Sequence, residues 1–481
     1  MTDPSRSPST ETAGWKLLAV LLVPLFMALV AVSVVNVALA PIGDSLEASS
    51  SQLQWVVSGY ALAFGVLLVP AGRLGDLIGR RRLLLLGVAV FTAGSLGAAV
   101  APNSEFLNAA RVAQGLGSGL INPQTIGLIQ KHFTGQSRAR AFATMATTVA
   151  LATAVGPVLG GFLIEVLGPE AGWRWMFALN VPLGVATVVL GLRWLPDDSA
   201  ARGSTPDLDP WGTLLLGATV LSVMFPFVER RGGVLGWAPL ALGALLLVAF
   251  LAWEHRYRAA GRAPVVDLSM FSSEPFRNGI AVVSIHFLGA TSIFLVIPLW
   301  MQMHLGHSAF AAALVLLPSS VAAGLSAQFA GRRVLQWGRK LVIGGFCVVI
   351  SALLLMAVLT PFIEDGRLPW WTAAFAAVLI GLGQGSVVSP NTTLTLQAMD
   401  SRQGGVAGGL MSLGQRVGTA IGTALVPGVL FAMVGAGRPW SDAFRVTLLT
   451  IVAIAAIALA ISVVDLRREQ RERTNSPEGA R

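Results

Sequence analysis

The residues of this sequence that could do chemistry are a few titratable side chains set inside long apolar stretches. Arg111, His286 and Arg416 each lie within such a stretch. A charged side chain in the hydrocarbon of a bilayer costs about 2.5–3.5 kcal/mol on insertion scales, so it needs a partner or water and marks a candidate pathway for protons or substrates. A histidine can also titrate near neutral pH. Two plainer interpretations stay open: His286 as a polar packing residue, and Arg111 extending its guanidinium to a nearby interface.

Enzymatic and cofactor chemistry has no comparable basis in the sequence. The titratable groups do not gather at one depth, as a membrane enzyme would require, and no GxxxxGK[ST] loop could cradle nucleotide phosphates. The single cysteine, Cys347, rules out a disulfide framework, and its apolar neighbours favour a packing role over a redox or zinc site. We therefore expect neither an enzyme nor an ATP-driven pump, and neither a cofactor nor a metal.

The elements that must position these side chains are membrane-spanning helices. Of 481 residues, 54% are hydrophobic and only 12% are charged, about half the charged share of an ordinary soluble domain, and the mean hydropathy is +0.71. A bilayer span takes about 20 apolar residues, and runs of that length follow one another along the chain. The fourteen expected spans are 15–40, 53–72, 83–101, 105–130, 139–166, 174–195, 210–228, 237–254, 278–300, 309–330, 341–361, 370–397, 405–433 and 442–464. The first run is longer than the apolar region of a signal peptide, so we expect no signal peptide.

Lysine and arginine collect in every second loop, which predicts the orientation of the spans. Basic residues concentrate in 73–82, 131–140, 256–277 and 332–340, whereas the loop 41–52 carries none. The positive-inside rule then places both termini in the cytoplasm. Because the basic residues flank spans and do not gather in one domain, the net charge of +9 does not predict a nucleic-acid partner. Heavy use of Arg, Ala and Gly points to a bacterial genome, and hence to a bacterial inner membrane.

The loop after the second expected span carries the string GRLGDLIGRR over residues 72–81. Its glycines allow a tight turn and close helix approach, and its acid can pair with an arginine or lie at the N-terminus of a neighbouring helix. The string resembles the signature between helices two and three of the major facilitator superfamily. The resemblance implies a cytoplasmic latch that rearranges as the transporter alternates between its two open states. The latch residues would be Gly72, Asp76, Gly79, Arg80 and Arg81.

A second, degenerate copy of this string, GRRVLQWGRK, occupies residues 331–340. Leu335 stands where the first copy has its acid, which makes a symmetric latch doubtful. Internal duplication is typical of transporters that rock one bundle against another. The expected organisation is a cytoplasmic tail at 1–14, a six-helix bundle at 15–195, two inserted helices with flanking cytoplasmic loops at 196–277, a second six-helix bundle at 278–464 and a cytoplasmic tail at 465–481.

Two further motifs resemble those of exporters in the same superfamily. The string RVAQGLG at 111–117 resembles the fourth-helix motif, which implies a role in proton coupling for Arg111 and Gln114. The string ATAVGPVLGG at 152–161 resembles the antiporter motif, with Ala152 in place of its first glycine. Small residues at this spacing let helices approach closely, so a generic packing face stays open as the alternative. The antiporter-motif residues are Gly156, Pro157, Gly160 and Gly161.

The segment WRWMFALNVPLG at 173–184 narrows the resemblance to the fourteen-span drug:proton antiporter branch, which contains the EmrB/QacA-type multidrug exporters. One departure from that branch concerns proton coupling. Relatives usually carry an acid five residues before Asn36, where this chain has Ala31. The acids closest to the spans, such as Glu165, Glu229 and Glu254, lie near span ends. Whether transport is coupled to protons is therefore left open by the sequence.

The polar residues that remain within the spans are candidates for a substrate cavity. These candidates are Asn36, Asn122, Gln124, Gln384, Asn391 and Arg416, and the proton-coupling candidates are Arg111, Gln114 and His286. Buried cations favour neutral or anionic amphiphiles over positively charged dyes.

The prediction is an all-α membrane protein with the major facilitator fold, working as a monomer. It is expected to export hydrophobic drugs, metabolites or lipids by alternating access, in exchange for protons. Two alternatives stay open: a proton-independent facilitator or lipid translocator of the same fold, and a transport-dead membrane sensor or scaffold.

Overall fold

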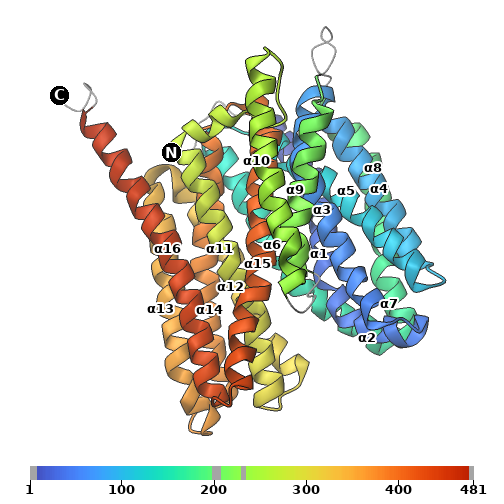
Figure 1. Ribbon diagram of the computed structural model, residues 1–481, viewed down its shortest axis with the longest axis vertical. Coiled ribbons are helices and arrows are strands. Elements are labelled where there is room, and N and C mark those ends of the chain that lie inside the picture. Colours follow the sequence, from blue (N-terminus) through green and yellow to red (C-terminus); the bar gives the residue numbers. More distant parts are fainter. Residues whose placement is uncertain (1–7, 198–206, 229–233, 476–481) are drawn as a thin grey trace. The chain divides into compact units, whose positions relative to one another are not determined.

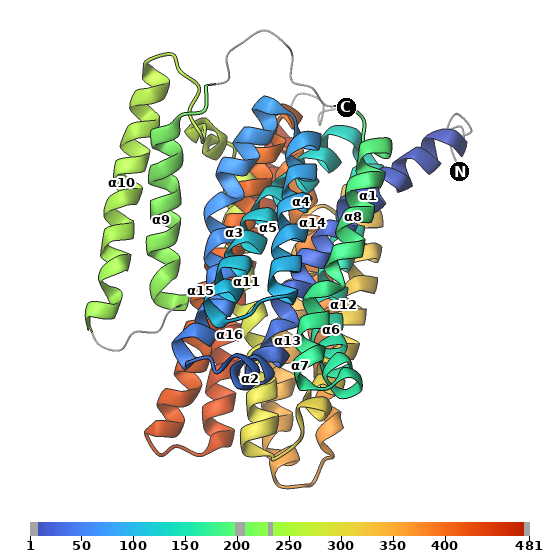
Figure 2. The ribbon, with the colours of Figure 1, turned by 90° about the vertical axis from the view of Figure 1, so that its right-hand side faces the viewer.

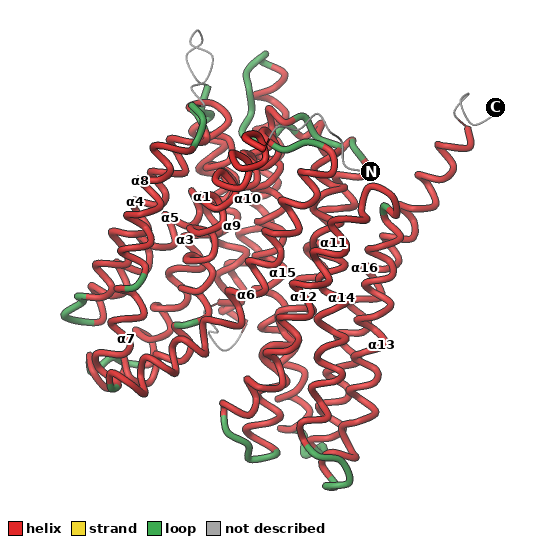
Figure 3. The backbone as a smooth tube through the Cα atoms, turned by 180° about the vertical axis from the view of Figure 1, so that it is seen from behind, coloured by secondary structure: helices red, strands yellow, loops and turns green. Residues whose placement is uncertain are grey.

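The computed structural model describes residues 8–197, 207–228 and 234–475. Almost all of these residues are helical, and no strand occurs within these three ranges (Figure 3). The predicted all-α fold is therefore confirmed. The outermost residues of both predicted tails, part of the expected loop after residue 195, and Glu229 lie outside the described residues.

The helices form two compact units, and each is described here by itself (Figure 1). Unit 1 comprises Met1–Thr134, Ala152–Leu268 and Asp400–Leu413, and unit 2 comprises Gly135–Leu151, Ser269–Met399 and Gly414–Arg481. Two helices, α6 (Gly135–Leu167) and α15 (Gly404–Gly435), contribute residues to both units.

The remaining helices each belong to one unit. Those of unit 1 are α1 (Pro8–Ser33), α2 (Val35–Leu46), α3 (Ser50–Ile78), α4 (Arg80–Ala99), α5 (Ser104–His132), α7 (Pro169–Ala178), α8 (Asn180–Trp194), α9 (Pro210–Val228) and α10 (Ala238–Ala259). Those of unit 2 are α11 (Glu274–Leu299), the π-helical turn η3 (Trp300–His304), α12 (Ala309–Trp337), α13 (Arg339–Glu364), α14 (Ala373–Gln397) and α16 (Trp440–Asn475). Short 3-10 turns lie at Val234–Trp237, Leu268–Ser272, Trp370–Thr372 and Ser401–Gln403.

A helical segment occupies each of the fourteen predicted spans. Among the described residues, thirteen of these segments are long and apolar enough to cross a membrane. The fourteenth is α5, whose mean hydropathy is lowered by polar residues such as Arg111, Gln114 and Asn122. Because these side chains are buried within the protein, α5 does not need an apolar sequence to lie in a bilayer.

Two predicted spans are interrupted in the structure. The first is divided between α1 and α2 at Val34, next to Ser33, whose hydroxyl group donates to carbonyl oxygens of its own helix and to that of Ala152. The sixth is divided between α7 and α8 at Leu179. Pro182 lies in the first turn of α8 and lacks the N–H group that would continue the ladder of hydrogen bonds from α7.

Unit 1 is held together by close contacts between helices. α5 packs against both α3 and α4. A Cβ atom on Gly115 would collide with the carbonyl oxygen of Tyr60 on α3, and one on Gly117 would collide with the backbone of Phe91 on α4. Glycine at these positions lets the three backbones approach closely, as is common between membrane helices.

The inserted helices α9 and α10 form a hairpin that lies beside α3 (Figure 2). α9 supplies the contact with α3, where Met224 packs onto the bare backbone of Gly65. The exposed face of α10 is strongly apolar, with Leu245 and Val248 among its most exposed side chains. Such a face fits lipid, so the composition of the hairpin agrees with two further membrane spans.

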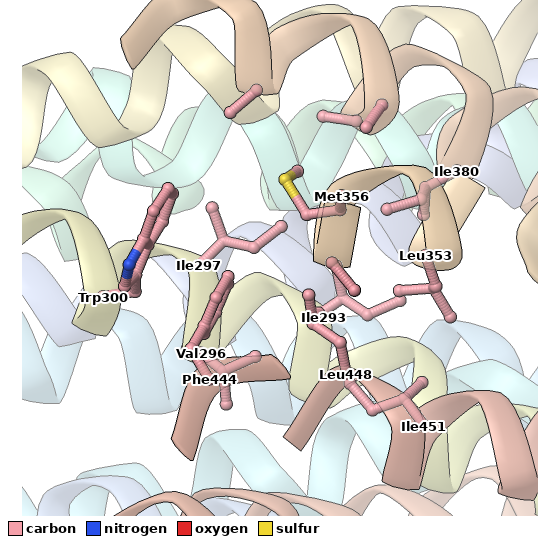
Figure 4. Packing of buried hydrophobic residues seen from close by; sticks show 14 of the residues in the cluster. Ile293, Val296, Ile297, Trp300, Leu353, Met356, Ile380, Phe444, Leu448 and Ile451 are labelled. Carbon is pink, nitrogen blue, oxygen red and sulfur yellow. The ribbon is translucent and has the colours of Figure 1, made fainter. Parts of the chain in front are cut away.

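Unit 2 has a core of buried apolar side chains from α11, α13, α14 and α16 (Figure 4). The indole of Trp300 stacks on the ring of Phe444 with centroids 4.6 Å apart and an interplanar angle of 6°. Trp300 also donates through Nε1 to the carboxylate of Glu364, at 2.9 Å. The stack and the hydrogen bond join the ends of three helices.

Candidate functional site

The predicted latch forms a buried ionic cluster in unit 1. Asp76, near the end of α3, accepts hydrogen bonds from Nε of Arg80 at 2.8 Å and pairs with its Nη2 at 2.7 Å. The same carboxylate accepts from the backbone N–H groups of Gly405 and Val406, each at 3.1 Å. Asp76 therefore both pairs with an arginine and caps the N-terminus of α15, where the helix dipole favours a negative charge.

Arg80 distributes its remaining hydrogen bonds over two other elements. Nη1 donates to the carbonyl oxygen of Gly127 on α5 at 2.6 Å, and Nη2 donates to that of Ser401 at 2.7 Å. The Asp76 and Arg80 side chains are only 6% and 5% exposed. The cluster therefore joins α3, α4, α5 and the start of α15 through charges that water does not screen.

Two glycines of the motif have distinct roles in this geometry. Gly72 lies against the backbone of Gly405, so a Cβ atom on Gly72 would collide with the Gly405 carbonyl group. Gly79 joins α3 to α4 with φ of 108°, a backbone conformation that side chains disfavour. Arg81 lies apart from the cluster, and it donates to the carbonyl oxygen of Leu192 at the end of α8.

Two predicted cavity residues of α5 contact helices that the latch joins. Asn122 accepts a hydrogen bond from the hydroxyl group of Ser412 on α15 at 2.7 Å. Gln124 is fully buried and donates to the carbonyl oxygen of Ala71 at 2.8 Å, while its Oε1 is a buried acceptor with no partner within the described ranges. Both side chains thus pack between α5 and the helices that the latch joins.

The degenerate second copy forms a related cluster in unit 2. Arg339 pairs through Nε with Asp465 of α16 at 2.5 Å and donates through Nη1 to Oδ1 of Asn391 at 2.6 Å. Asn391 in turn donates to the carbonyl oxygen of Gly279 on α11, and Asn278 donates to Asp465. The acid that is missing at position 335 is therefore supplied by another helix, and Asn391 is fully buried within this cluster.

The Arg111 guanidinium lies buried in unit 1 among aromatic rings and neutral acceptors. It is 1% exposed, donates through Nε to the carbonyl oxygen of Val56 at 2.8 Å, and donates through Nη1 to Gln114 at 2.8 Å. Its Cζ atom lies 4.4 Å from the ring centroid of Tyr60 and 5.7 Å from that of Phe177. The side chain does not extend to an interface, so the snorkelling alternative is wrong for this structure.

The hydrogen bonds around Arg111 continue into a longer chain of polar groups. Gln114 donates to the hydroxyl group of Ser95 on α4 at 2.7 Å. The hydroxyl group of Tyr60 lies 2.8 Å from the carbonyl oxygen of Ala28 and 2.6 Å from the hydroxyl oxygen of Ser118. No salt bridge to Arg111 occurs within the described part of the chain. Its charge is therefore stabilised by carbonyl and amide oxygens and by cation–π contacts.

The antiporter motif packs against the interruption between α1 and α2. A Cβ atom on Gly156 would collide with the Ser33 side chain, and Gly160 lies against Val34. Gly161 faces open space. Pro157 lies within α6, which continues through it. The motif therefore places the bare backbone of α6 on the segment just after Ala31, which is itself fully buried.

Two polar candidates line a small apolar cavity in unit 2. His286 on α11 and Gln384 on α14 share this cavity with side chains such as Ile293 and Phe346. His286 is 5% exposed and meets the rings of Phe287 and Phe346 edge to face. Nε2 of Gln384 is buried without a hydrogen-bond partner in the described structure. The cavity therefore has apolar walls with two polar groups.

The other two candidates lie elsewhere. Asn36, in the first turn of α2, has an exposed side chain, and Arg416 on α15 is half-buried. The structure also adds residues that sequence reasoning missed, chiefly Tyr60 and Ser95 beside Arg111, and Asp465 beside Arg339. A buried tyrosine within an apolar span was a visible signal, because its hydroxyl group needs a partner.

Comparisons with known proteins agree with this architecture. The family model of the Major Facilitator Superfamily matches residues 21–423 and, separately, residues 279–481. The probable actinorhodin transporter of Streptomyces coelicolor is 34% identical over 432 residues, covering 89% of this chain and 74% of that protein. The multidrug resistance protein Stp of Mycobacterium tuberculosis is 31% identical over 424 residues, covering 86% of this chain and 75% of its own length.

A solved structure gives the same fold at low sequence identity. The human organic anion transporter MFSD10 superposes with a TM-score of 0.64 at 14% identity, covering 95% of this chain and all of that chain. The long matches to the family model and to the bacterial relatives settle the class: the chain belongs to the Major Facilitator Superfamily. It is a multi-pass membrane protein of the drug-efflux branch and a transporter, not an enzyme, as the sequence predicted.

Proposed function

We propose that this protein exports hydrophobic or amphiphilic small molecules from the cytoplasm by alternating access, in exchange for protons. The observation that carries the proposal is the Asp76 cluster, which fastens the first turn of α15 to α3 and α5. Because α15 continues from unit 1 into unit 2, releasing its first turn is a step that alternating access would use. Relatives described as an actinorhodin transporter and as a multidrug resistance protein support drug-like cargo.

The substrate proposal follows from the buried charge of Arg111. Its guanidinium is surrounded by Tyr60, Gln114 and Phe177, and no carboxylate forms an ion pair with it in the described ranges. A fixed positive charge of this kind attracts anionic groups, tolerates neutral ones and repels cations. We therefore assign the transporter planar or amphiphilic molecules that are neutral or anionic. His286 is the titratable group within the spans that we assign to the proton.

A proton-independent facilitator or lipid translocator is the second candidate. The buried side chain at position 31 is an alanine, so the first span carries no acid at this depth. Mid-membrane carboxylates are the usual proton carriers in pumps and transporters. The two candidates predict different behaviour when the proton gradient is collapsed: the exporter stops accumulating substrate, and the facilitator continues to equilibrate it.

Everted vesicles from an expressing strain test both candidates. With a respiratory substrate present, adding a transported anionic dye should release protons from the vesicle lumen in the wild type, and Arg111→Ala should abolish the release. The exposed Arg333→Ala serves as the matched control and should leave the release unchanged. Dye uptake without proton release would favour the facilitator, and absence of uptake for a panel of anionic and neutral dyes would contradict export.

We further propose that the protein works as a monomer in the bacterial inner membrane with both termini in the cytoplasm. The support is the concentration of Lys and Arg in alternate loops, including those that flank Asp76 and Arg339.

A further inference from the structure

The carboxyl groups of Asp209 and Glu254 meet at one end of the α9–α10 hairpin. Asp209 directly precedes α9, Glu254 lies near the end of α10, and the two residues are 0% and 1% exposed. Oδ1 of Asp209 accepts from the N–H group of Gly212 at 2.9 Å and from Nε1 of Trp253 at 2.8 Å. Oε2 of Glu254 accepts from the N–H group of Val266 at 3.1 Å. One oxygen of each carboxyl group therefore has donors.

The other two oxygens have none. Oδ2 of Asp209 and Oε1 of Glu254 are buried and have no hydrogen-bond partner among the residues that the structure describes. Both lie next to the same point above Gly212, where a Cβ atom would collide with each of them, so the two oxygens are close neighbours. Ionised carboxylates only accept hydrogen bonds, so two of them cannot satisfy each other. One proton placed between the two oxygens turns this pair of unmet acceptors into a donor and an acceptor.

The surroundings oppose a double negative charge at this position. Within the described ranges, no salt bridge reaches Asp209 or Glu254. Arg73 on α3 donates to the carbonyl oxygen of Ala263, at 3.4 Å. Asp207 adds a further negative charge, because the Tyr257 hydroxyl donates to it and lowers the pKa of that carboxyl group.

The remaining charged groups of these segments have other contacts or lie on exposed surfaces. Arg258 pairs with Asp267, Arg262 lies over the Tyr257 ring, and His255 and Arg256 are exposed. None of these cationic side chains therefore forms an ion pair with Asp209 or Glu254 in the described ranges. When two carboxyl groups share one buried site, repulsion between their charges favours protonation of one of them, as in the carboxyl pair of aspartic proteases.

We propose that Asp209 and Glu254 form a proton-binding site that holds one shared proton at neutral pH. The proton fastens three elements: the start of α9 through Asp209, the end of α10 through Glu254, and the following loop through Val266. Binding takes one proton from water and release returns it, with no other bond made or broken. When the proton leaves, repulsion between two carboxylates weakens the hydrogen bonds to Trp253 and Val266. The hairpin is thereby pH-sensitive independently of the transport cycle.

Infrared spectroscopy of the purified full-length protein tests the shared proton directly. A wild-type titration should show the carbonyl stretch of a protonated carboxyl group at neutral pH, and alkaline pH should remove it. Glu254→Gln and Asp209→Asn should each lack this band, because each leaves a single carboxylate that an amide N–H group can satisfy. The exposed Glu165→Gln is the matched control and should retain it. A wild-type spectrum without such a band at neutral pH would overturn the proposal, even if both variants failed to fold.

Hydrogen exchange at Val266 gives an independent measurement. After correction for the intrinsic pH dependence of exchange, protection of the Val266 amide in the wild type should fall about tenfold or more as the pair loses its proton. Protection in Glu254→Gln should not depend on pH. Equal pH dependence in wild type and variant would contradict the role of the pair. If Na⁺ or Mg²⁺ alone restored protection at alkaline pH, the site would bind a metal cation, and the proposal of a shared proton would be overturned.

Discussion

Arg339 and Asp465 form a buried ion pair, with 2.5 Å between Nε and Oδ2, at the degenerate copy of the loop motif. The first copy carries its acid four residues before the arginine, and the second has Leu335 at that position. In the second copy the acid comes from α16 instead of from α12. Both clusters therefore contain an Asp–Arg ion pair, but the pairs join different helices. Asp76 caps α15, whereas Asp465 joins α13 to the end of α16 and to Asn278.

The pair in unit 2 should couple strongly in a double-mutant cycle. Removing one partner of a buried ion pair costs about 3–5 kcal/mol, because the other charge is left uncompensated. We expect Arg339→Met and Asp465→Leu each to destabilise the protein by this amount, and the double variant by much less than the two together. Unfolding in detergent micelles gives the four stabilities. The exposed pair Arg367 and Asp365, 3.8 Å apart, is the control and should show almost no coupling.

Asp76→Asn should weaken the latch more than it weakens the fold. The amide has a single oxygen, so it can accept from only one of the N–H groups of Gly405 and Val406, and it loses the charge that pairs with Arg80. We expect export to fall by more than about tenfold, equivalent to losing about 1.5–3 kcal/mol from one charged hydrogen bond. Dye efflux from loaded cells measures this. Asp197→Asn removes an acid that is 73% exposed and 3.9 Å from Arg81, and efflux reduced equally by both substitutions would contradict a specific role for Asp76.

Gly405→Ala should disturb the same cluster through shape alone. A Cβ atom at this position would meet the Asp76 carboxylate and the Gly72 carbonyl group, so the first turn of α15 would have to move away. We expect lower thermal stability, by about 1–3 kcal/mol, together with lower export. Gly344→Ala, where a Cβ atom meets nothing within 4 Å, should change neither quantity. A Gly405→Ala protein with wild-type stability would show that the cluster does not depend on this close approach.

The latch could be predicted from sequence because its parts are local. Asp76 and Arg80 lie one helical turn apart, and Gly79 supplies the positive φ between two helices. The partner elements could not be predicted. The N–H groups that Asp76 caps belong to Gly405 and Val406, and backbone donors carry no side-chain signature. For the same reason, the acceptor of Arg111 on Val56 could not be found in the sequence.

Polar residues within spans were harder to interpret than charged ones. The sequence predicts that Asn391 lines a substrate cavity. In the structure its side chain instead accepts a hydrogen bond from Arg339 and donates one to Gly279. An amide in an apolar span signals burial and an unmet hydrogen bond, but whether its partner is a substrate or another helix depends on tertiary packing. Glu254 illustrates the opposite case. Its place near a span end kept it out of the candidate residues, yet Glu254 is buried and its carboxyl group accepts a hydrogen bond from Val266 in the following loop.

Arg111→Lys should separate charge from geometry in the aromatic site. Lysine keeps the positive charge but lacks the planar group that contacts Tyr60 and also donates to Val56 and Gln114. We expect substrate affinity to fall at least tenfold in Arg111→Lys and further in Arg111→Ala, with anionic substrates losing more than neutral ones. Equilibrium binding to purified protein measures this. Arg174→Lys, at an arginine that lies over Trp173 and donates to Ala101, is the control. Equal losses for neutral and anionic ligands would contradict an electrostatic role.

The proposed topology can be tested by labelling single cysteines in a Cys347→Ala background. Arg82 and Arg332 have exposed side chains in the two copies of the loop motif, and Ser50 is exposed at the start of α3. If both copies face the cytoplasm, an impermeant maleimide added to intact cells should label Ser50→Cys but neither Arg82→Cys nor Arg332→Cys, and everted vesicles should give the reverse pattern. Labelling of Arg82→Cys and Arg332→Cys from opposite sides would show that the two copies of the loop motif lie on opposite faces of the bilayer. The Asp76 and Arg339 clusters could not then both act at the cytoplasmic face, and the proposed alternating access would lose its structural basis.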